Sequence, residues 1–174
     1  VFAVELDRKL FEIMEETLKD YNNVTTFNKD ILKSKHHIHP MIIEAVSDYI
    51  RAAPPSENLT VKVVSNLPYY ISTPVIIDLL QEVLPIKTMI LMLQRDTTDR
   101  MKAQPGTRNY GVLSIMTKLF ADAKVLKKLP PDVFWPVPLV DSAIVKMEVN
   151  QHRHADRIHD YQNFQNVVHA IYVS

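Results

Sequence analysis

The chain contains no cysteine and only two glycines among its 174 residues. Without cysteine it can form no disulfide bond, no thiolate zinc site and no cysteine nucleophile. The absence of cysteine is compatible with a reducing cytosol, and we expect a cytoplasmic protein. No apolar run reaches the roughly 18 residues that a membrane helix needs, and the first residues lack the basic flank of a signal peptide. We therefore expect no association with a membrane.

The chain also lacks net charge, because 20 lysines and arginines balance 20 aspartates and glutamates. This balance excludes a protein uniformly coated with positive charge. The charges are nevertheless unevenly distributed: residues 1–30 carry a net charge of −3, and residues 86–128 contain nine basic and three acidic residues, a net charge of +6. Such a basic segment attracts polyanions, although a solvated charged face without any partner has the same pattern.

Apolar periodicity alternates between strand and helix over about the first 100 residues. Apolar runs rich in β-branched residues predict strands at residues 1–6, 24–27, 61–65 and 87–93. Helical spacing predicts helices at residues 10–18, 41–50 and 73–85. This alternation indicates an α/β fold built on a mostly parallel sheet with helices on both faces.

The pattern changes in the second half of the chain. Residues 112–120 have the spacing of a helix, and residues 124–129 and 142–149 have the composition of strands, which we expect to pair antiparallel at the sheet edge. Apolar residues at helical spacing between residues 157 and 173 predict one more helix.

Polar residues follow the first three predicted strands. In an open α/β sheet, ligands bind at the carboxyl ends of the strands, and Glu5, Asp30 and Asn66 stand at these ends. A carboxylate at Glu5 can accept hydrogen bonds from both hydroxyls of a ribose, and one at Asp30 can accept a bond from the exocyclic amine of adenine. Either acid alone is equally typical of a helix cap or of a solvated loop.

The segment Asn66-Leu67-Pro68-Tyr69 carries a more specific signal. Asparagine, a hydrophobic residue, proline and an aromatic residue, directly after an apolar strand, are typical of methyltransferases that modify the exocyclic amine of adenine. That nitrogen is a poor nucleophile until acceptors hold its hydrogens, and the Asn66 oxygen and a backbone carbonyl beside Pro68 can supply two of them. Proline restricts the turn, and Tyr69 offers a face for an extruded base.

A proline-rich loop at residues 134–142 contains the other aromatic candidates. We expect Phe134 to form a second wall of the base pocket, with Trp135 as its alternative. Aromatic residues in such a loop can equally fill the core of the protein.

Six segments occur in the same order as in the ribosomal RNA adenine dimethyltransferases, which the chain therefore resembles. They are VELD (4–7), DIL (30–32), SNLPYYISTP (65–74), LQR (93–95), PGTRNYGVLS (105–114) and FWPVPLVDS (134–142). The resemblance implies a Rossmann-like class I methyltransferase fold. It also implies an enzyme that uses S-adenosylmethionine to convert two adjacent adenines of small-subunit ribosomal RNA, in a pre-ribosomal particle, to N6,N6-dimethyladenine.

The resemblance also assigns roles to single residues. Glu5 would hold the cofactor ribose and Asp30 its adenine, and Leu6, Ile31 and Asn66 would also contact the cofactor. The target base would be held by Asn66, Leu67, Pro68, Tyr69 and Phe134. Separately from the resemblance, we expect the basic segment 86–128 to contact the ribosomal RNA, through Arg95, Arg100, Lys102, Arg108 and Tyr110.

The chain departs from the family pattern in three ways. Asp96 stands where family members usually have glutamate. The family has a strand and a glycine-rich loop before the first acidic strand end, whereas the two glycines here are Gly106 and Gly111. The family also continues into a C-terminal helical domain. We expect a fragment, with residues 1–150 an incomplete catalytic domain and residues 151–174 the start of a helical region. We expect it to bind S-adenosylmethionine weakly and to be inactive alone.

Three other interpretations remain open at this point. His36, His37 and His39 suggest a metal site, but they have no carboxylate or cysteine partner at ligand spacing, so we expect no metal. A non-catalytic RNA-binding or transcription factor is a second, against which Asn66 and Tyr69 argue. A DNA adenine-N6 methyltransferase is a third, and residues 105–114 fit the RNA family better.

Overall fold

The computed structural model describes residues 1–34, 37–54, 56–82, 84–150 and 158–172. The chain divides into two compact units, Val1–Leu59 and Thr60–Ser174, and each unit is considered by itself. Among the described residues, no helix combines the length and the hydropathy needed to cross a membrane. His36 and the ends of the predicted 157–173 helix lie outside the described residues.

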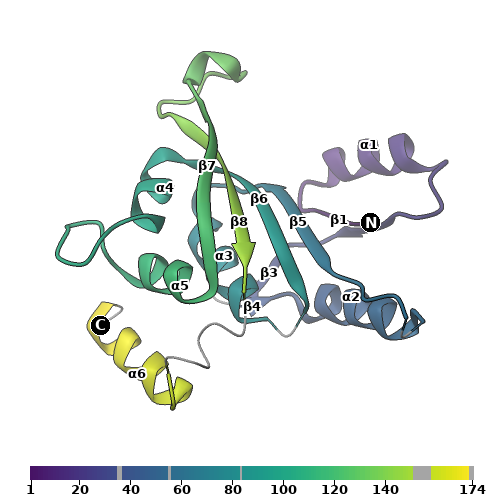
Figure 1. Ribbon diagram of the computed structural model, residues 1–174. Helices are drawn as coiled ribbons and strands as arrows, with labels where there is room; N and C mark the ends of the chain where they lie inside the picture. The colour runs from purple at the N-terminus through teal and green to yellow at the C-terminus, as the bar shows by residue number, and fades with distance from the viewer. Residues whose placement is uncertain (35–36, 55, 83, 151–157, 173–174) are drawn as a thin grey trace. The chain divides into compact units, whose positions relative to one another are not determined.

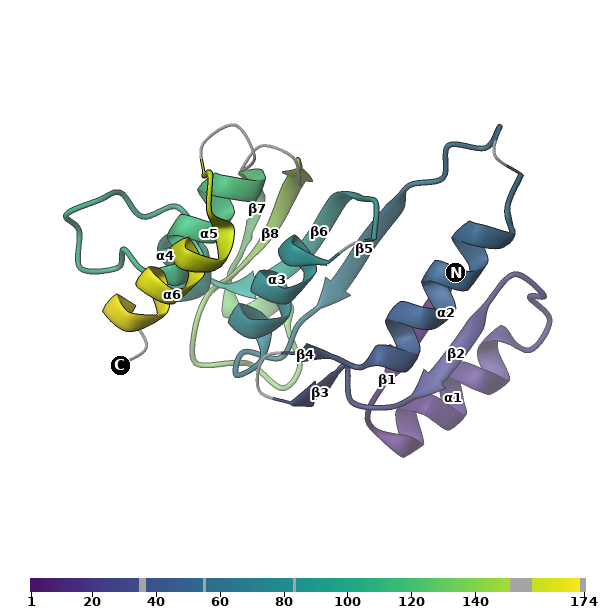
Figure 2. The ribbon, with the colours of Figure 1, turned by 90° about the horizontal axis from the view of Figure 1, so that it is seen from below.

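The first unit is built around two short parallel strands. β1 (Phe2–Glu5) and β2 (Thr25–Asn28) pair in parallel and are connected through α1 (Arg8–Leu18). A short antiparallel pair, β3 (Leu32–Ser34) and β4 (His37–Ile38), precedes α2 (Pro40–Ala52). Figures 1 and 2 show α1 and α2 on opposite sides of the β1–β2 pair.

Aromatic contacts hold α2 against β1. The Phe2 ring stacks on that of Phe27 on β2, with the ring centres 6.5 Å apart. It meets the ring of Tyr49 on α2 edge-on, with the ring centres 5.7 Å apart. Both distances fall within the range in which aromatic pairs attract each other beyond simple burial. The three rings therefore join both strands to one helix.

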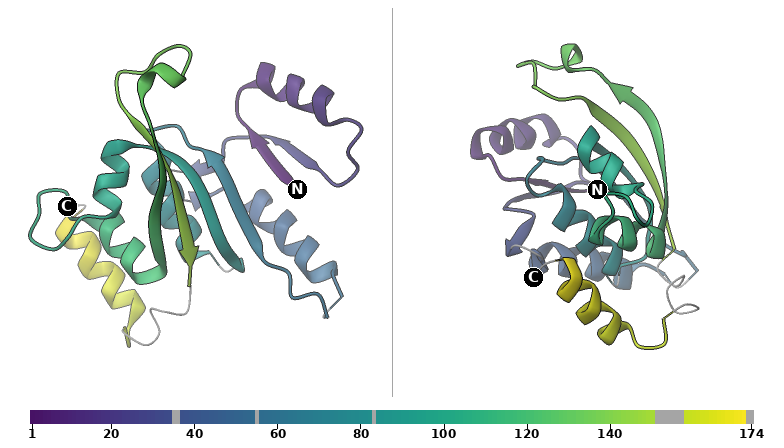
Figure 3. Two further views of the ribbon diagram at one scale, coloured as in Figure 1. Left: turned by 45° about the horizontal axis from the view of Figure 1, so that its top comes forward. Right: turned by 90° about the vertical axis from the view of Figure 1, so that its left-hand side faces the viewer.

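The second unit contains a four-stranded sheet with the order β5-β6-β8-β7. Its elements are β5 (Val61–Asn66), α3 (Ser72–Gln81), β6 (Ile86–Gln94), α4 (Arg95–Met101), α5 (Val112–Phe120), β7 (Ala121–Leu129), the 3-10 turn η1 (Pro131–Val133), β8 (Ser142–Val149) and α6 (Tyr161–Tyr172). β5 and β6 are parallel, whereas β8 is antiparallel to both β6 and β7. The connection between β7 and β8 projects beyond the ends of β5 and β6 (Figures 1 and 3).

The core of this unit lies between one face of the sheet and helices α3 to α5 (Figure 3). Alternate residues of β6 and β8 are buried on that face, as the period of two in a strand requires. The most deeply buried side chains include Met89, Leu91, Leu93, Val145 and Met147 from the sheet, and Ile76, Leu80 and Leu113 from the helices. On the opposite face of β5, Lys62, Val64 and Asn66 are exposed.

These strand pairings confirm the α/β class and correct the predicted sheet. The prediction of a mostly parallel sheet is wrong: among the strands that the structure describes, β3–β4, β6–β8 and β7–β8 are antiparallel, and two pairs, β1–β2 and β5–β6, are parallel. The physical reason is that β8 returns between β6 and β7 and takes the place of a further parallel strand. The predicted antiparallel pairing of the last two strands is confirmed, with β7 at the edge. The predicted boundary at residue 150 stays a prediction.

Helix α6 is attached to the second unit through Tyr161. The ring of Tyr161 meets Phe120 edge-on at 5.9 Å, and its hydroxyl donates a hydrogen bond of 2.9 Å to Gln81 Oε1 on α3. Gln165 Nε2 donates to the same oxygen. Burial of the phenol raises the pKa of Tyr161 to about 12. The neutral phenol is therefore the form that the folded chain favours.

This raised pKa predicts that the stabilisation from Tyr161 is lost in alkali. In the unfolded chain the phenol ionises near its ordinary pKa of 10.0, so its contribution is complete below that pH and declines as the pH rises toward about 12. We expect wild type to exceed Tyr161→Phe in free energy of unfolding at pH 8, and this difference to shrink by pH 11. Urea unfolding of both proteins at the two pH values measures it. An unchanged difference would contradict the role of the phenol.

Candidate functional site

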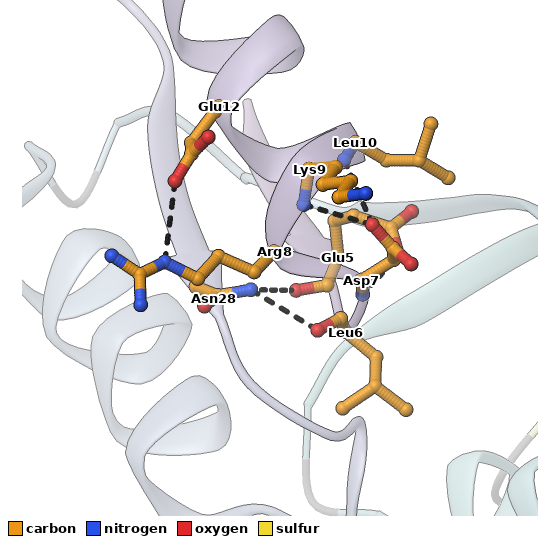
Figure 4. A network of polar contacts seen from close by, with 8 residues as sticks. All are labelled: Glu5, Leu6, Asp7, Arg8, Lys9, Leu10, Glu12 and Asn28. Carbon is orange, nitrogen blue, oxygen red and sulfur yellow. Dashed lines mark hydrogen bonds and ion pairs between the residues drawn. The ribbon is translucent and has the colours of Figure 1, made fainter.

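The carboxyl ends of β1 and β2 meet at one edge of the first unit, because the two strands are parallel (Figure 4). Asn28 Nδ2 donates hydrogen bonds to the carbonyl oxygens of Glu5, at 3.0 Å, and of Leu6, at 3.2 Å. The backbone N–H of Lys29 donates to the same Glu5 carbonyl at 3.2 Å. These bonds fix the backbone where the chain leaves β1, and Leu6 is left exposed.

The Glu5 carboxylate is held by the backbone that follows it. Its Oε1 accepts a 2.8 Å hydrogen bond from the N–H of Asp7, and Asp7 in turn caps α1 by accepting bonds from the N–H groups of Lys9 and Leu10 (Figure 4). The helix cap at this strand end is thus Asp7 and not Glu5. Because a carboxylate offers about four acceptor positions, the half-buried Glu5 keeps acceptor capacity for a ligand.

Asp30 has the same local arrangement after β2. Its Oδ1 accepts a 2.9 Å hydrogen bond from the N–H of Leu32, two residues further on. The carbonyl of the intervening Ile31 accepts a 2.8 Å bond from the N–H of His39, which ties this segment to the start of α2. The Asp30 carboxylate is exposed and Ile31 is half-buried. Glu5 and Asp30 are therefore each oriented by one backbone hydrogen bond and retain a second oxygen.

In the second unit, residues 66–69 form the turn between β5 and α3. Asn66 is the last residue of β5 and is exposed, whereas Leu67 is only 5% exposed and anchors the turn in the core. The Pro68 carbonyl accepts a 3.2 Å hydrogen bond from the N–H of Ile71. Among the residues that the structure describes, none forms a hydrogen bond with the Asn66 side chain. The carboxamide of Asn66 is therefore available to a ligand.

Tyr69 connects this turn to the start of β8. Its hydroxyl lies 3.5 Å from Ser142 Oγ, a weak contact, and its carbonyl accepts a 3.0 Å hydrogen bond from the buried Ser72 hydroxyl. The Tyr69 side chain is 43% exposed. Ser142 ends the loop that contains Phe134, so the turn and the loop meet at this point. Phe134 is half-buried, and within the described part of the chain no ring contact or hydrogen bond joins it to the residues of the turn.

Arg95 holds the same loop from the side of β6. The backbone N–H of Arg95 donates a 2.9 Å hydrogen bond to the Asp141 carbonyl, and its guanidinium lies 3.3 Å from the Asp141 carboxylate and 3.8 Å from that of Asp99. An open hollow of about 390 Å³ lies here, and it is lined by Gln94, Arg95, Asp96, Asp99, Leu139, Val140 and Asp141. Its three carboxylates make it unsuited to a phosphate. None of residues 66–69 lines it.

The other residues assigned to RNA lie on α4 and on the loop that leads to α5. Arg100, Lys102 and Arg108 are exposed. The Lys118 ammonium lies 5.7 Å from the centre of the Tyr110 ring, within range of a cation–π interaction. Gly106 has a φ of +83°, a left-handed conformation that glycine adopts readily, and this permits the tight loop.

The structure distributes the predicted site residues between the two units. Glu5, Leu6, Asp30 and Ile31 belong to the first, and the remaining ten belong to the second. Three residues that contact predicted site residues received no role in the sequence analysis. They are Asp7, which contacts Glu5, Asp141, which contacts Arg95, and Ser142, which contacts Tyr69. His39 caps α2 through a hydrogen bond that its Nδ1 accepts from Met41 N–H at 3.3 Å. Within the described part of the chain, no group of three possible metal ligands is found.

Comparisons with known proteins agree on one family. The sequence model of the family "Ribosomal RNA adenine dimethylase" matches residues 1–173. Ribosomal RNA small subunit methyltransferase A of Alkaliphilus oremlandii is 42% identical over 149 residues, which cover 86% of this chain and 48% of that protein. The protein of the same name from Streptococcus sanguinis is 41% identical over 173 residues, or 99% of this chain and 56% of that protein.

Solved structures support the fold. A dimethyladenosine transferase from Plasmodium falciparum superimposes with a TM-score of 0.72 at 24% identity, over 97% of this chain and 54% of that one. The 23S rRNA methyltransferase ErmE gives a TM-score of 0.57 at 24% identity, over 86% of this chain and 52% of that one. The chain spans about half the length of the curated relatives that it matches.

Proposed function

Because this chain belongs to the ribosomal RNA adenine dimethylase family, we propose that the full-length protein transfers methyl groups from S-adenosylmethionine to adenine N6 in small-subunit ribosomal RNA. The product is N6,N6-dimethyladenine, and the reaction belongs to the maturation of the small subunit in the cytoplasm. The observation that carries the proposal is the turn after β5, where Leu67 is buried and the Asn66 carboxamide is left without a hydrogen-bond partner among the described residues.

The target nitrogen must be activated by acceptors. Its lone pair is delocalised into the adenine ring, and acceptors for its two hydrogens turn the lone pair out of that conjugation. Asn66 Oδ1 is one acceptor. A carbonyl beside Pro68 is the second, since the Pro68 oxygen uses one lone pair for Ile71 and has another. The role of the turn is therefore to hold the amine in a reactive orientation.

The cofactor is assigned to the first unit. Glu5 and Asp30 fit a nucleoside because each carboxylate is oriented by one backbone N–H and keeps a second oxygen for a ribose hydroxyl or an adenine amine. The exposed Leu6 and the half-buried Ile31 supply apolar contact to the adenine ring. When bound, S-adenosylmethionine supplies the electrophilic methyl group. Asn66 also borders it in this proposal, within a Rossmann-like class I methyltransferase fold.

Two aromatic residues are assigned to the target base, namely Tyr69 and Phe134. If Tyr69 acts by stacking, Tyr69→Ala should lower kcat/KM for RNA roughly 5- to 150-fold, because stacking is worth about 1–3 kcal/mol per base. Tyr69→Phe should stay within about threefold, since its ring remains and the lost hydroxyl contact with Ser142 is long, at 3.5 Å. Ser142→Ala removes the same contact from the other side and is the matched control. Equal damage from Tyr69→Phe and Tyr69→Ala would contradict stacking.

Contacts with the ribosomal RNA are assigned to the exposed residues Arg100, Lys102 and Arg108. Their side chains attract phosphate without reading sequence. Tyr110 is assigned with them. Arg95, which was predicted to contact RNA, has its guanidinium between Asp99 and Asp141, and we propose that its main role is to hold the loop.

Methyl transfer by the full-length protein tests the proposal. Isolated small ribosomal subunits and duplex DNA should be offered together with S-adenosylmethionine, and the modified bases identified by mass spectrometry. We expect dimethyladenine in the ribosomal RNA alone. Transfer to the duplex would instead indicate a DNA adenine methyltransferase. Binding of the subunit without any transfer would indicate a non-catalytic RNA-binding or transcription factor.

A further inference from the structure

The loop between β7 and β8 exposes a run of apolar side chains to solvent. Trp135 is 94% exposed and Leu139 is 100% exposed, and Val133 and Val137 are both more than half exposed. Trp135 is also the only tryptophan of the chain. Apolar groups gathered in this way indicate a binding surface, and Figures 1 and 3 show that the loop projects from its sheet.

Phe134 and Trp135 are adjacent in the loop but differ in exposure. Phe134 is half-buried, whereas Trp135 is 94% exposed. A ligand group that contacts Trp135 would therefore differ from the base that contacts Phe134.

The loop is also restrained before any ligand binds. Pro136 and Pro138 fix the backbone on one side of Trp135, and Asp141 is held by the backbone and side chain of Arg95. A restrained aromatic residue loses little conformational freedom on binding. Lys127 and Lys128, on the strand that leads into the loop, are exposed and offer positive charge.

We propose that Trp135 is a stacking platform for an unpaired RNA base that flanks the target adenine. This inference rests on the proposed function, and it assigns to the loop a second nucleotide that the Asn66 turn does not hold. An indole face accepts any base, and the exposed lysines on β7 match the charge of the adjoining phosphate. Trp135 thereby favours target adenines that have an unpaired neighbouring base.

Tryptophan fluorescence of the full-length protein tests this assignment. Single-stranded RNA of about 12 nucleotides containing adjacent adenines is the probe, and Trp135→Phe is the blank that isolates the Trp135 emission. We expect RNA to quench that emission, and one abasic position beside the adenines to abolish the quenching. Trp135→Ala should weaken RNA binding about tenfold by anisotropy, and Trp135→Phe less than threefold. Leu139→Ala removes an exposed side chain of the same loop that cannot stack on a base, and it should weaken RNA binding less than Trp135→Ala does.

Other outcomes overturn the assignment in recognisable ways. If anisotropy shows that RNA binds but the Trp135 emission is not quenched, the indole does not contact the RNA. Equal losses from Trp135→Ala and Leu139→Ala indicate a general apolar contact, such as one with a protein. Methyl transfer with an unchanged KM in Trp135→Ala overturns the platform and leaves the proposed function intact. Quenching by RNA in a protein that transfers no methyl group supports the platform and contradicts the proposed function.

Discussion

Asn66→Ala in the full-length protein is expected to lower methyl transfer at least a hundredfold and to leave the affinity for S-adenosylmethionine within about threefold of wild type. Loss of one oriented hydrogen-bonding group at a transition state commonly costs about 3 kcal/mol. The Asn66 side chain has no hydrogen-bond partner among the described residues, so its removal leaves no internal donor or acceptor unsatisfied. Single-turnover rates on small ribosomal subunits measure the loss, and calorimetry measures cofactor binding.

Two further variants distinguish the acceptor role from a general disturbance. Asn66→Asp keeps an oxygen acceptor at this position and should be at least tenfold more active than Asn66→Ala. Asn163→Ala removes an exposed asparagine of α6 and should have wild-type activity. Methyl transfer by Asn66→Ala within about threefold of wild type would exclude Asn66 from the reaction.

Glu5→Ala is expected to weaken S-adenosylmethionine binding roughly 10- to 150-fold, since hydrogen bonds to a charged group contribute about 1.5–3 kcal/mol. The variant also removes the acceptor for the Asp7 N–H, which Glu5 Oε1 holds at 2.8 Å. Glu5→Gln separates the two effects, because its amide oxygen can still accept that N–H. We expect Glu5→Gln to bind the cofactor with intermediate affinity, as measured by calorimetry.

The matched control for Glu5 is Glu44, an exposed acid on α2 of the same unit. Glu44→Ala removes an equal charge and should leave the dissociation constant unchanged. If Glu5→Ala binds S-adenosylmethionine as tightly as Glu44→Ala does, the ribose contact is not made by Glu5. If the melting temperature falls in Glu5→Ala but not in Glu5→Gln, Glu5 has a local structural role.

The sequence predicted local structure best where apolar period and end signals coincide. α5 has the predicted bounds, Val112–Phe120, because apolar residues at helical spacing follow Gly111 directly. β8 likewise has the predicted bounds, Ser142–Val149. α4 was missed because its seven residues are mostly charged or hydroxyl-bearing and contain no apolar stripe. β3 and β4 were missed because strands of two or three residues are too short to have a period.

Apart from the antiparallel pairing of the last two strands, the strand order and the contacts that support the site could not be predicted, since both depend on contacts between distant parts of the chain. The alternation of apolar and polar residues in β8 does not indicate that this strand inserts between β6 and β7. The position of Asn66 at a strand end was predicted from local sequence and is confirmed. The contacts of Tyr69 with Ser142 and of Arg95 with Asp141 join residues 73 and 46 positions apart, and only the folded chain shows them.

The pairing of Arg95 with two aspartates also changes the expected response of RNA binding to salt. Each cation that replaces a condensed counterion on RNA adds to the slope of log affinity against log salt concentration, by about 0.7 for a single strand. A guanidinium already neutralised by Asp99 and Asp141 displaces no such ion. Among the four cations first assigned to RNA, we therefore expect Arg100, Lys102 and Arg108 to set that slope, and Arg95 to act mainly on the loop that contains Asp141.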